Sequence, residues 1–181
     1  TGSGQTGSAV MAAAAQNLCP VTLELGGKSP AIILNDFDLK TAVERIMYAK
    51  CLNAGQICVT VDYVYVPAYQ VDEFVRLARE VVQKRYTGKE SKDYTAIIDT
   101  RSFERLNGAL SEVKTAGTRV VSLFDGEPLD APTRKIAPHL VIDPSKNSEL
   151  MTREIFGPIL PVIPYTDVAS VVNEINARPR P

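Results

Sequence analysis

The sequence predicts an α/β fold with a mostly parallel sheet that is flanked by helices. Short apolar runs at residues 31–34, 63–66 and 160–163 have the length and composition of buried strands. Patterns with helical spacing lie between these runs, and such alternation is typical of parallel sheets. A chain of 181 residues, of which 45% are hydrophobic and 23% charged, is able to bury a core of this size.

The chain begins with a glycine- and serine-rich loop that leads into a helix. Alanines at residues 12–15 favour the helix. The spacing of Gly2, Gly4 and Gly7 matches G-x-G-x-x-G, a pattern in which glycines let the backbone approach a phosphate at a helix N-terminus. No strand is visible before this loop, so a plain glycine-rich helix start is an equally good interpretation.

A strand is predicted at residues 21–25, where polar and apolar residues alternate. Glu24 therefore lies at a strand end, beside Gly26 and Gly27. Three interpretations of Glu24 compete. It could bind a ribose hydroxyl about 20 residues after a glycine loop, it could be a general base that faces a catalytic cavity, or it could be a surface glutamate.

The rest of the chain continues the alternation of helix and strand. A turn at residues 35–38 and a loop at 86–94 separate these elements, and Gly117 is a natural helix stop. A hairpin-like stretch rich in glycine and proline lies between the apolar runs at 120–121 and 140–142. Helices are expected at residues 39–52, from Pro67 through 82, at 102–115 and at 167–176.

The three cysteines, Cys19, Cys51 and Cys58, have no paired spacing, which disfavours a disulfide framework and predicts a reducing, cytoplasmic setting. The single histidine, His139, leads an apolar run and is expected to be structural, so no metal site and no histidine-dependent triad is predicted. Cys51 lies inside a helical pattern and is expected in the core. Cys58 follows Gly55 in a tight connection between helix and strand, where a thiol could be a nucleophile or ordinary packing.

The formal net charge of −1 gives no basic field that would favour nucleic acid as a partner. The sequence contains no apolar run long enough to span a membrane and no signal segment. The chain opens on a glycine loop without a preceding strand and stops directly after a helix, so we expect it to be a fragment of a longer protein.

Four motifs occur in order along the chain, at residues 1–7, 23–30, 53–58 and 154–158. Together they resemble the signature motifs of the NAD(P)-dependent aldehyde dehydrogenase superfamily. Residues 20–22 and 59–64 are similar to its class 3 branch, and residues 176–181 to the bacterial enzymes of that branch that oxidise coniferyl aldehyde. The resemblance implies that residues 1–27 are the end of an NAD(P)-binding domain and that residues 28–181 are an incomplete catalytic domain.

The resemblance also implies roles for individual residues. Cys58 matches the nucleophile that attacks the aldehyde carbon, and Glu24 matches the general base that activates water. Glu154 matches the carboxylate that holds the nicotinamide ribose, and Phe156 lies beside the cofactor. In this interpretation the G-x-G-x-x-G match is a coincidence, because Gly4 replaces a hydroxyl residue. The other cofactor-binding residues that the resemblance implies are Ser3, Gly7, Leu25 and Gly26.

These roles imply oxidation of an aromatic or hydrophobic aldehyde with NAD or NADP, of which NAD is favoured, by a protein that forms a homodimer. The cofactor domain of the same protein would be a partner of this chain, and the 181 residues alone are expected to be inactive. Two alternatives stay open: transfer of the acyl group to coenzyme A, against which Glu24 argues, and a noncatalytic scaffold.

Overall fold

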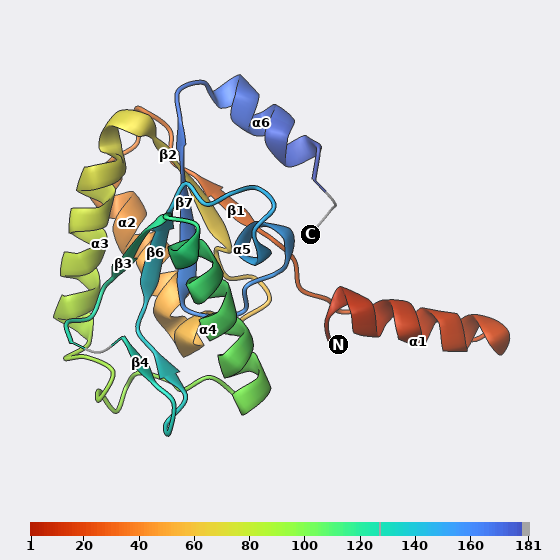
Figure 1. The fold of residues 1–181 in the computed structure, drawn as a ribbon. Coiled ribbons are helices and arrows are strands. Elements are labelled where there is room, and N and C mark those ends of the chain that lie inside the picture. The colour runs from red at the N-terminus through yellow and green to blue at the C-terminus, as the bar shows by residue number, and fades with distance from the viewer. Residues whose placement is uncertain (127, 179–181) are drawn as a thin grey trace.

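The computed structural model describes residues 1–126 and 128–178, so the last part of the match at residues 176–181 lies outside the described residues. The α/β fold is confirmed (Figure 1). Within the described ranges five strands form one sheet in the order β1-β2-β7-β6-β3, in which β3 is antiparallel to β6 and the other neighbours are parallel. These strands are β1 (Pro30–Ile32), β2 (Tyr63–Pro67), β7 (Ile159–Tyr165), β6 (His139–Ile142) and β3 (Arg119–Ser122).

Apart from the short α5, which was not predicted, the helices follow the predicted pattern closely. Aspartate side chains accept backbone N–H groups at the starts of three of them, because the first turn of a helix has unpaired donors: Asp38, Asp99 and Asp167. The helices are α1 (Gly4–Gln16), α2 (Leu39–Cys51), α3 (Val71–Arg85), α4 (Thr100–Thr115), α5 (Glu149–Thr152) and α6 (Val168–Asn176), with short 3₁₀ turns η1 (Leu52–Gly55) and η2 (Ala68–Gln70). The hairpin-like stretch contains the small pair β4 (Leu129–Asp130) and β5 (Lys135–Ile136).

The sheet is buried on both faces, as parallel sheets usually are. Successive side chains of a strand point to opposite faces, so β2 contributes to two clusters. Val64 and Val66 join the main core, which includes residues of α2 and α3. Tyr63 and Tyr65 join a smaller cluster on the other face that α6 covers through Val171.

Two predicted elements differ from the structure. Residues 21–25 form no strand; their only pairing in the described chain is an isolated bridge between Gly2 and Leu25, where the Gly2 N–H donates to the Glu24 carbonyl over 3.0 Å. A strand requires a hydrogen-bonding neighbour along its length, which an alternating pattern cannot reveal. The helix predicted from Pro67 begins at Val71, because Pro67 still pairs with Tyr165 in the sheet.

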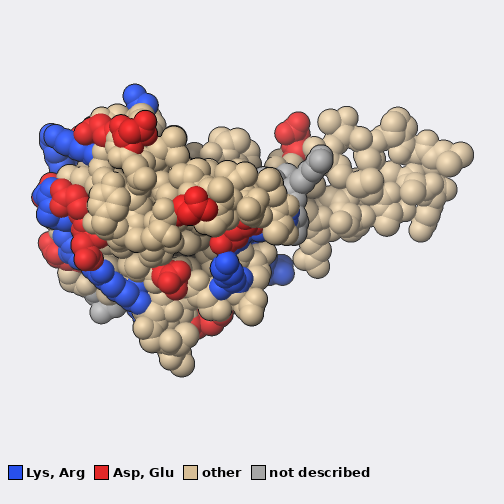
Figure 2. All heavy atoms as spheres, turned by 90° about the horizontal axis from the view of Figure 1, so that it is seen from above, with Lys and Arg blue, Asp and Glu red and all other residues tan. Residues whose placement is uncertain are grey.

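The first helix is the most exposed element of the chain. Figure 1 shows α1 projecting away from the other elements, and its sequence contains no charged residue. Figure 2 shows most of the lysine, arginine, aspartate and glutamate side chains on the compact body, and an acidic residue at the base of the projecting arm. Val10 and Met11 of α1 are 45% and 53% exposed, so α1 presents an uncharged, partly apolar surface. No helix in the two described ranges has both the length and the apolar character needed to cross a bilayer.

Candidate active site

A cavity of about 1430 Å³ opens where β1 and β2 begin. Ligands of open parallel sheets usually bind at the carboxyl ends of the strands, whereas this cavity lies at the amino ends. It is lined by most of the residues singled out from the sequence. These residues are Ser3, Glu24, Leu25, Gly26, Cys58, Glu154 and Phe156.

A left-handed turn leads the chain from α2 to Cys58. Asn53 and Ala54 have φ values of 51°, and Gly55 follows with 73°. Only glycine adopts this region freely, so the buried Ala54 stores backbone strain. A Cβ on Gly55 would lie 2.8 Å from the carbonyl carbon of Gly157 and closer still to its oxygen, so glycine is required there. The turn is thereby packed directly on the backbone that follows Phe156.

Gln56 fixes the same turn from the other side. Its side-chain amide donates to the carbonyls of Asn53 at 3.0 Å and Ala96 at 3.1 Å, and its Oε1 accepts from the N–H of Ile98 at 2.9 Å. The Gln56 side chain is buried, and these bonds hold the turn against the loop before α4. Cys58 itself is exposed and faces the cavity. A rigid turn with an exposed thiol gives a nucleophile a defined place.

Glu24 reaches the cavity from a different segment. Its side chain is exposed, and its backbone carbonyl accepts from the Gly2 N–H at 3.0 Å. Both Glu24 and Cys58 therefore line one cavity, although the whole of β1 and α2 lies between them in the sequence.

Glu154 is half-buried and lies against Gly26. A Cβ at position 26 would approach the Glu154 carboxylate more closely than real Cβ atoms ever do, so a side chain there would fill the space of the carboxylate. Burial raises the pKa of Glu154, and the backbone N–H of Gly27 opposes that rise by stabilising the carboxylate. Phe156, 38% exposed, also lines the cavity with a φ of 48°.

The start of α1 forms another wall. Ser3 is the N-cap, and its hydroxyl accepts from the N–H of Thr6 at 3.3 Å. Gly7 is buried and does not line the cavity. A Cβ on Gly7 would lie 2.9 Å from a methyl carbon of Leu25, so Gly7 allows α1 to pack on the segment that carries Glu24.

Three charged residues near the cavity were not singled out from the sequence. Lys28 forms an ion pair with the fully buried Asp62, directly before β2. Lys50, in the last turn of α2, is also fully buried, and its Nζ has no hydrogen-bond partner within the described chain. Burial lowers the pKa of Lys50 to about 8. Asp62 could have been noticed in the sequence, because it is a charged residue directly before an apolar strand.

The remaining candidate residues lie away from the cavity. His139 is buried in β6, and its Nδ1–H donates to the Ala137 carbonyl at 2.6 Å. Burial lowers the pKa of His139 to about 4 and raises the pKa of Cys51 to about 12, which suits structural roles for both. Cys19 is exposed and lies outside the cavity lining. Among the described residues, no cluster of histidine, cysteine, aspartate or glutamate could hold a metal ion.

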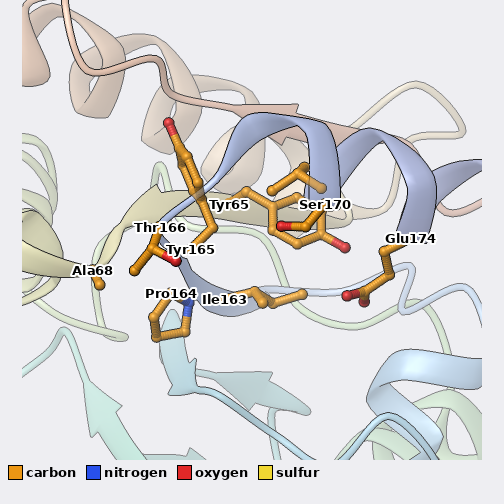
Figure 3. A pocket seen from close by; sticks show the side chains of 9 residues that line it. Tyr65, Ala68, Ile163, Pro164, Tyr165, Thr166, Ser170 and Glu174 are labelled. Carbon is orange, nitrogen blue, oxygen red and sulfur yellow. The ribbon is translucent and has the colours of Figure 1, made fainter.

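A smaller cavity of about 280 Å³ lies between α6 and the carboxyl ends of β2 and β7 (Figure 3). Figure 3 shows Tyr65 and Tyr165 from the strands and Glu174 from α6 around it. Its lining includes none of the residues singled out from the sequence. The larger cavity is therefore the candidate active site.

Comparisons with known proteins show which family the chain resembles. The profile of the aldehyde dehydrogenase family matches residues 1–180. A probable coniferyl aldehyde dehydrogenase of Pseudomonas aeruginosa is 46% identical over all of this chain, which covers 37% of that protein. The substrate-bound structure of Staphylococcus aureus AldH has a TM-score of 0.90 and 36% identity over 99% of this chain and 38% of its own.

A further solved structure, the Mycobacterium tuberculosis aldehyde dehydrogenase complexed with NAD⁺, has a TM-score of 0.84 and 31% identity. It is matched over 97% of this chain and 37% of its own. The chain therefore spans less than two fifths of the length of the proteins that it matches.

Proposed function

Because the chain belongs to the aldehyde dehydrogenase family, we propose that it is the catalytic part of a longer enzyme, called the parent protein below. The parent protein would oxidise an aldehyde to a carboxylic acid with NAD or NADP. The observation that carries this proposal is that Cys58, Glu24 and Glu154 line one cavity, from segments far apart in the sequence. Residues 1–27 would end the cofactor domain, and residues 28–181 would belong to the catalytic domain.

Cys58 would act as the nucleophile. Its sulfur forms a bond to the aldehyde carbon, and the carbonyl oxygen becomes the oxyanion of a thiohemiacetal. The backbone N–H of Cys58 can donate to that oxyanion. NAD(P) supplies the acceptor for the hydride that leaves the same carbon, and Cys58 then carries a thioester.

Glu24 would act as the general base. Because only the thiolate is a strong nucleophile, Glu24 can first take the proton of Cys58, directly or through a water molecule. Glu24 releases that proton to solvent, and in the second half of the reaction it takes a proton from water, whose oxygen attacks the thioester carbon. The carbon–sulfur bond then breaks, the Cys58 sulfur takes the proton back from Glu24, and the carboxylic acid leaves.

The residues around Glu154 fit the ribose of a nicotinamide cofactor. The missing side chain at Gly26 leaves the carboxylate resting on backbone, where it can accept hydrogen bonds from two ribose hydroxyls. Gly26, Leu25 and Phe156 would line the same subsite. Ser3 and Gly7 would serve the pyrophosphate side of the cofactor: Ser3 lines the cavity as the N-cap of α1, and Gly7 lets α1 pack on Leu25 beside it. NAD or NADP is the proposed cofactor, since related structures are described as complexes with NAD⁺ and with NADP, and NAD stays the favoured prediction.

An aromatic or hydrophobic aldehyde is the proposed substrate class. Apolar side chains line the same cavity as Cys58, among them Ile57, Tyr63 and Met151. A relative that is 46% identical is described as a probable coniferyl aldehyde dehydrogenase, which supports this class. A homodimeric parent protein in the cytoplasm stays a prediction.

The test compares turnover of coniferyl aldehyde, benzaldehyde and a long-chain aldehyde by the parent protein, with NAD and with NADP. We expect acid formation to be fastest with the aromatic aldehydes, and iodoacetamide to label Cys58 before Cys19 and Cys51. Acyl-coenzyme A as the only product, in reactions supplied with coenzyme A, would contradict the hydrolytic role of Glu24. The chain alone should show no turnover, because it spans only 37% of its relative.

A further inference from the structure

Asp62 is a completely buried carboxylate, 0% exposed, that follows Cys58 at the start of β2. Its Oδ1 accepts from the N–H of Ile155 at 2.9 Å, and its Oδ2 accepts from the Lys28 ammonium. The Asp62 N–H donates to the carbonyl of Ser29 at 2.9 Å. Asp62 therefore joins the segment before β1 to the segment that carries Glu154.

Lys28 provides the other half of this connection. Its Nζ donates to Asp62 and also to the carbonyls of Leu150 at 2.6 Å and Arg153 at 3.0 Å. An ammonium group has three donors, so all of them are in use. Burial lowers the pKa of Lys28, and Asp62 opposes that shift by favouring the charged form.

Two of these bonds are made to the residues directly before and after Glu154. The Arg153 carbonyl belongs to the peptide group before Glu154, and the Ile155 N–H belongs to the peptide group after it. The two members of one buried ion pair therefore hold both peptide groups of Glu154. Arg105 of α4 adds a bond to the Ile155 carbonyl at 2.5 Å.

We propose that Lys28 and Asp62 are positioning residues that fix the Glu154 carboxylate over Gly26 and thereby set the affinity of the parent protein for its nicotinamide cofactor. This inference rests on the proposed function, in which Glu154 binds the cofactor ribose. In this arrangement Lys28, which also lines the cavity, and Asp62 act through the backbone of Glu154. A displacement of about 1 Å at such a carboxylate is enough to lose its directed hydrogen bonds.

The loss of either partner is expected to release Glu154. Removing one member of a buried ion pair leaves the other charge uncompensated, so the surrounding segments rearrange. Asp62→Asn keeps an oxygen for the Ile155 N–H but turns an N–H₂ donor toward Lys28. Lys28→Met keeps most of the side-chain volume but removes the donors to Asp62 and to the Arg153 carbonyl.

The test measures the KM and kcat for NAD⁺ of the parent protein in four forms: unmodified, Asp62→Asn, Glu154→Gln and the double variant. We expect each single substitution to raise the KM for NAD⁺ at least tenfold, with a smaller change in kcat. Because Asp62 acts through Glu154, the KM for NAD⁺ of the double variant should be less than threefold higher than that of Glu154→Gln alone. If the two residues acted independently, their effects would multiply, and the KM of the double variant would rise about a hundredfold above that of the unmodified protein.

Leu123→Ala serves as the matched control, since Leu123 is fully buried next to β3, at the opposite edge of the sheet from β1. It should lower thermal stability and leave the KM for NAD⁺ within twofold. An unchanged KM in Asp62→Asn, or multiplied effects in the double variant, would overturn the inference about Asp62. An unchanged KM in Glu154→Gln would instead overturn the proposed role of Glu154.

Lys28 is tested by Lys28→Met and, if that variant fails to fold, by Lys28→Arg. Arginine keeps the charge that Asp62 needs but cannot place its donors at the same three acceptors. We expect Lys28→Met to raise the KM for NAD⁺ at least tenfold and Lys28→Arg several-fold. A KM within twofold of the unmodified protein in a folded variant would show that Lys28 does not position Glu154.

Discussion

The carboxylate of Glu154 rests on the Cα atom of Gly26, in the space that the Cβ of any other residue would occupy. This relationship joins two motifs that lie near opposite ends of the sequence. It also makes the backbone at position 26 part of the surface that would hold the cofactor ribose.

Substituting Gly26 is therefore expected to weaken cofactor binding. In Gly26→Ala the new methyl group must displace the Glu154 carboxylate, so the KM of the parent protein for NAD⁺ should rise at least tenfold while kcat falls less. Steady-state kinetics measure both. Gly108→Ala is the control, because a Cβ at position 108 meets no atom within 4 Å and alanine favours the helix α4 by about 0.5–1 kcal/mol. Equal KM values for the two variants would contradict this arrangement.

Alanine substitutions at Gly55 and Gly117 distinguish the cost of backbone strain from the cost of a steric clash. Both have left-handed φ values, 73° and 77°, but only at Gly55 would an added Cβ meet other atoms within 4 Å. Alanine should cost about 1–2 kcal/mol of stability at either site through strain. At Gly55 the clash with Gly157 should add about 1–3 kcal/mol and displace Cys58. Urea unfolding of both variants checks this, and equal losses would contradict the packing of the turn on Gly157.

Lys50 should destabilise the fold at neutral pH. Its folded-state pKa of about 8 lies below the ordinary value of 10.5, so the folded state resists protonation. At pH 7 this difference costs on the order of 3 kcal/mol, and stability should rise as the pH increases from about 8 to 10.5. Lys50→Met should unfold at higher urea concentration at pH 7 and show less of this rise. A less stable Lys50→Met variant would indicate that Lys50 has a partner that compensates its charge.

His139 should make the fold sensitive to mild acid. Burial lowers its folded-state pKa from 6.5 to about 4, so the unfolded chain binds a proton more readily in this range. Stability should therefore be full above pH 6.5 and decline as the pH falls toward 4, by up to roughly 3 kcal/mol. The difference in stability between His139→Gln and the unmodified chain should shrink as the pH is lowered. A difference that stays constant from about pH 7 down to about pH 4 would contradict the burial of a neutral imidazole.

Much of the fold could be predicted because its signals are local. The apolar runs of β2 and β7 and the capping aspartates Asp38 and Asp167 each act within a few residues. The tight turn before Cys58 was also visible, through Gly55. Residues 21–25 show the limit of local signals, because an alternating pattern does not specify whether a pairing strand is present.

The supporting residues of the candidate site could not be predicted for a related reason. Asp62 obtains its role from Lys28 and Ile155, which lie 34 and 93 residues away. Lys50 occupies the last turn of α2, where a lysine usually faces solvent and favours the helix dipole, so its burial depends on the packing of the whole site.

The proposed reaction depends most on the thioester that Cys58 would carry and on the water that Glu24 would activate to release it. The direct measurement is intact and peptide mass spectrometry of parent protein with Glu24→Gln, after mixing with benzaldehyde and NAD⁺. We predict a benzoyl group on Cys58 that forms more slowly than in the unmodified protein, because Glu24 also takes the thiol proton, and that then accumulates with one equivalent of NADH because its hydrolysis is slower still. Stoichiometric NADH without an acyl group on Cys58, or an acyl group on another residue, would contradict this mechanism.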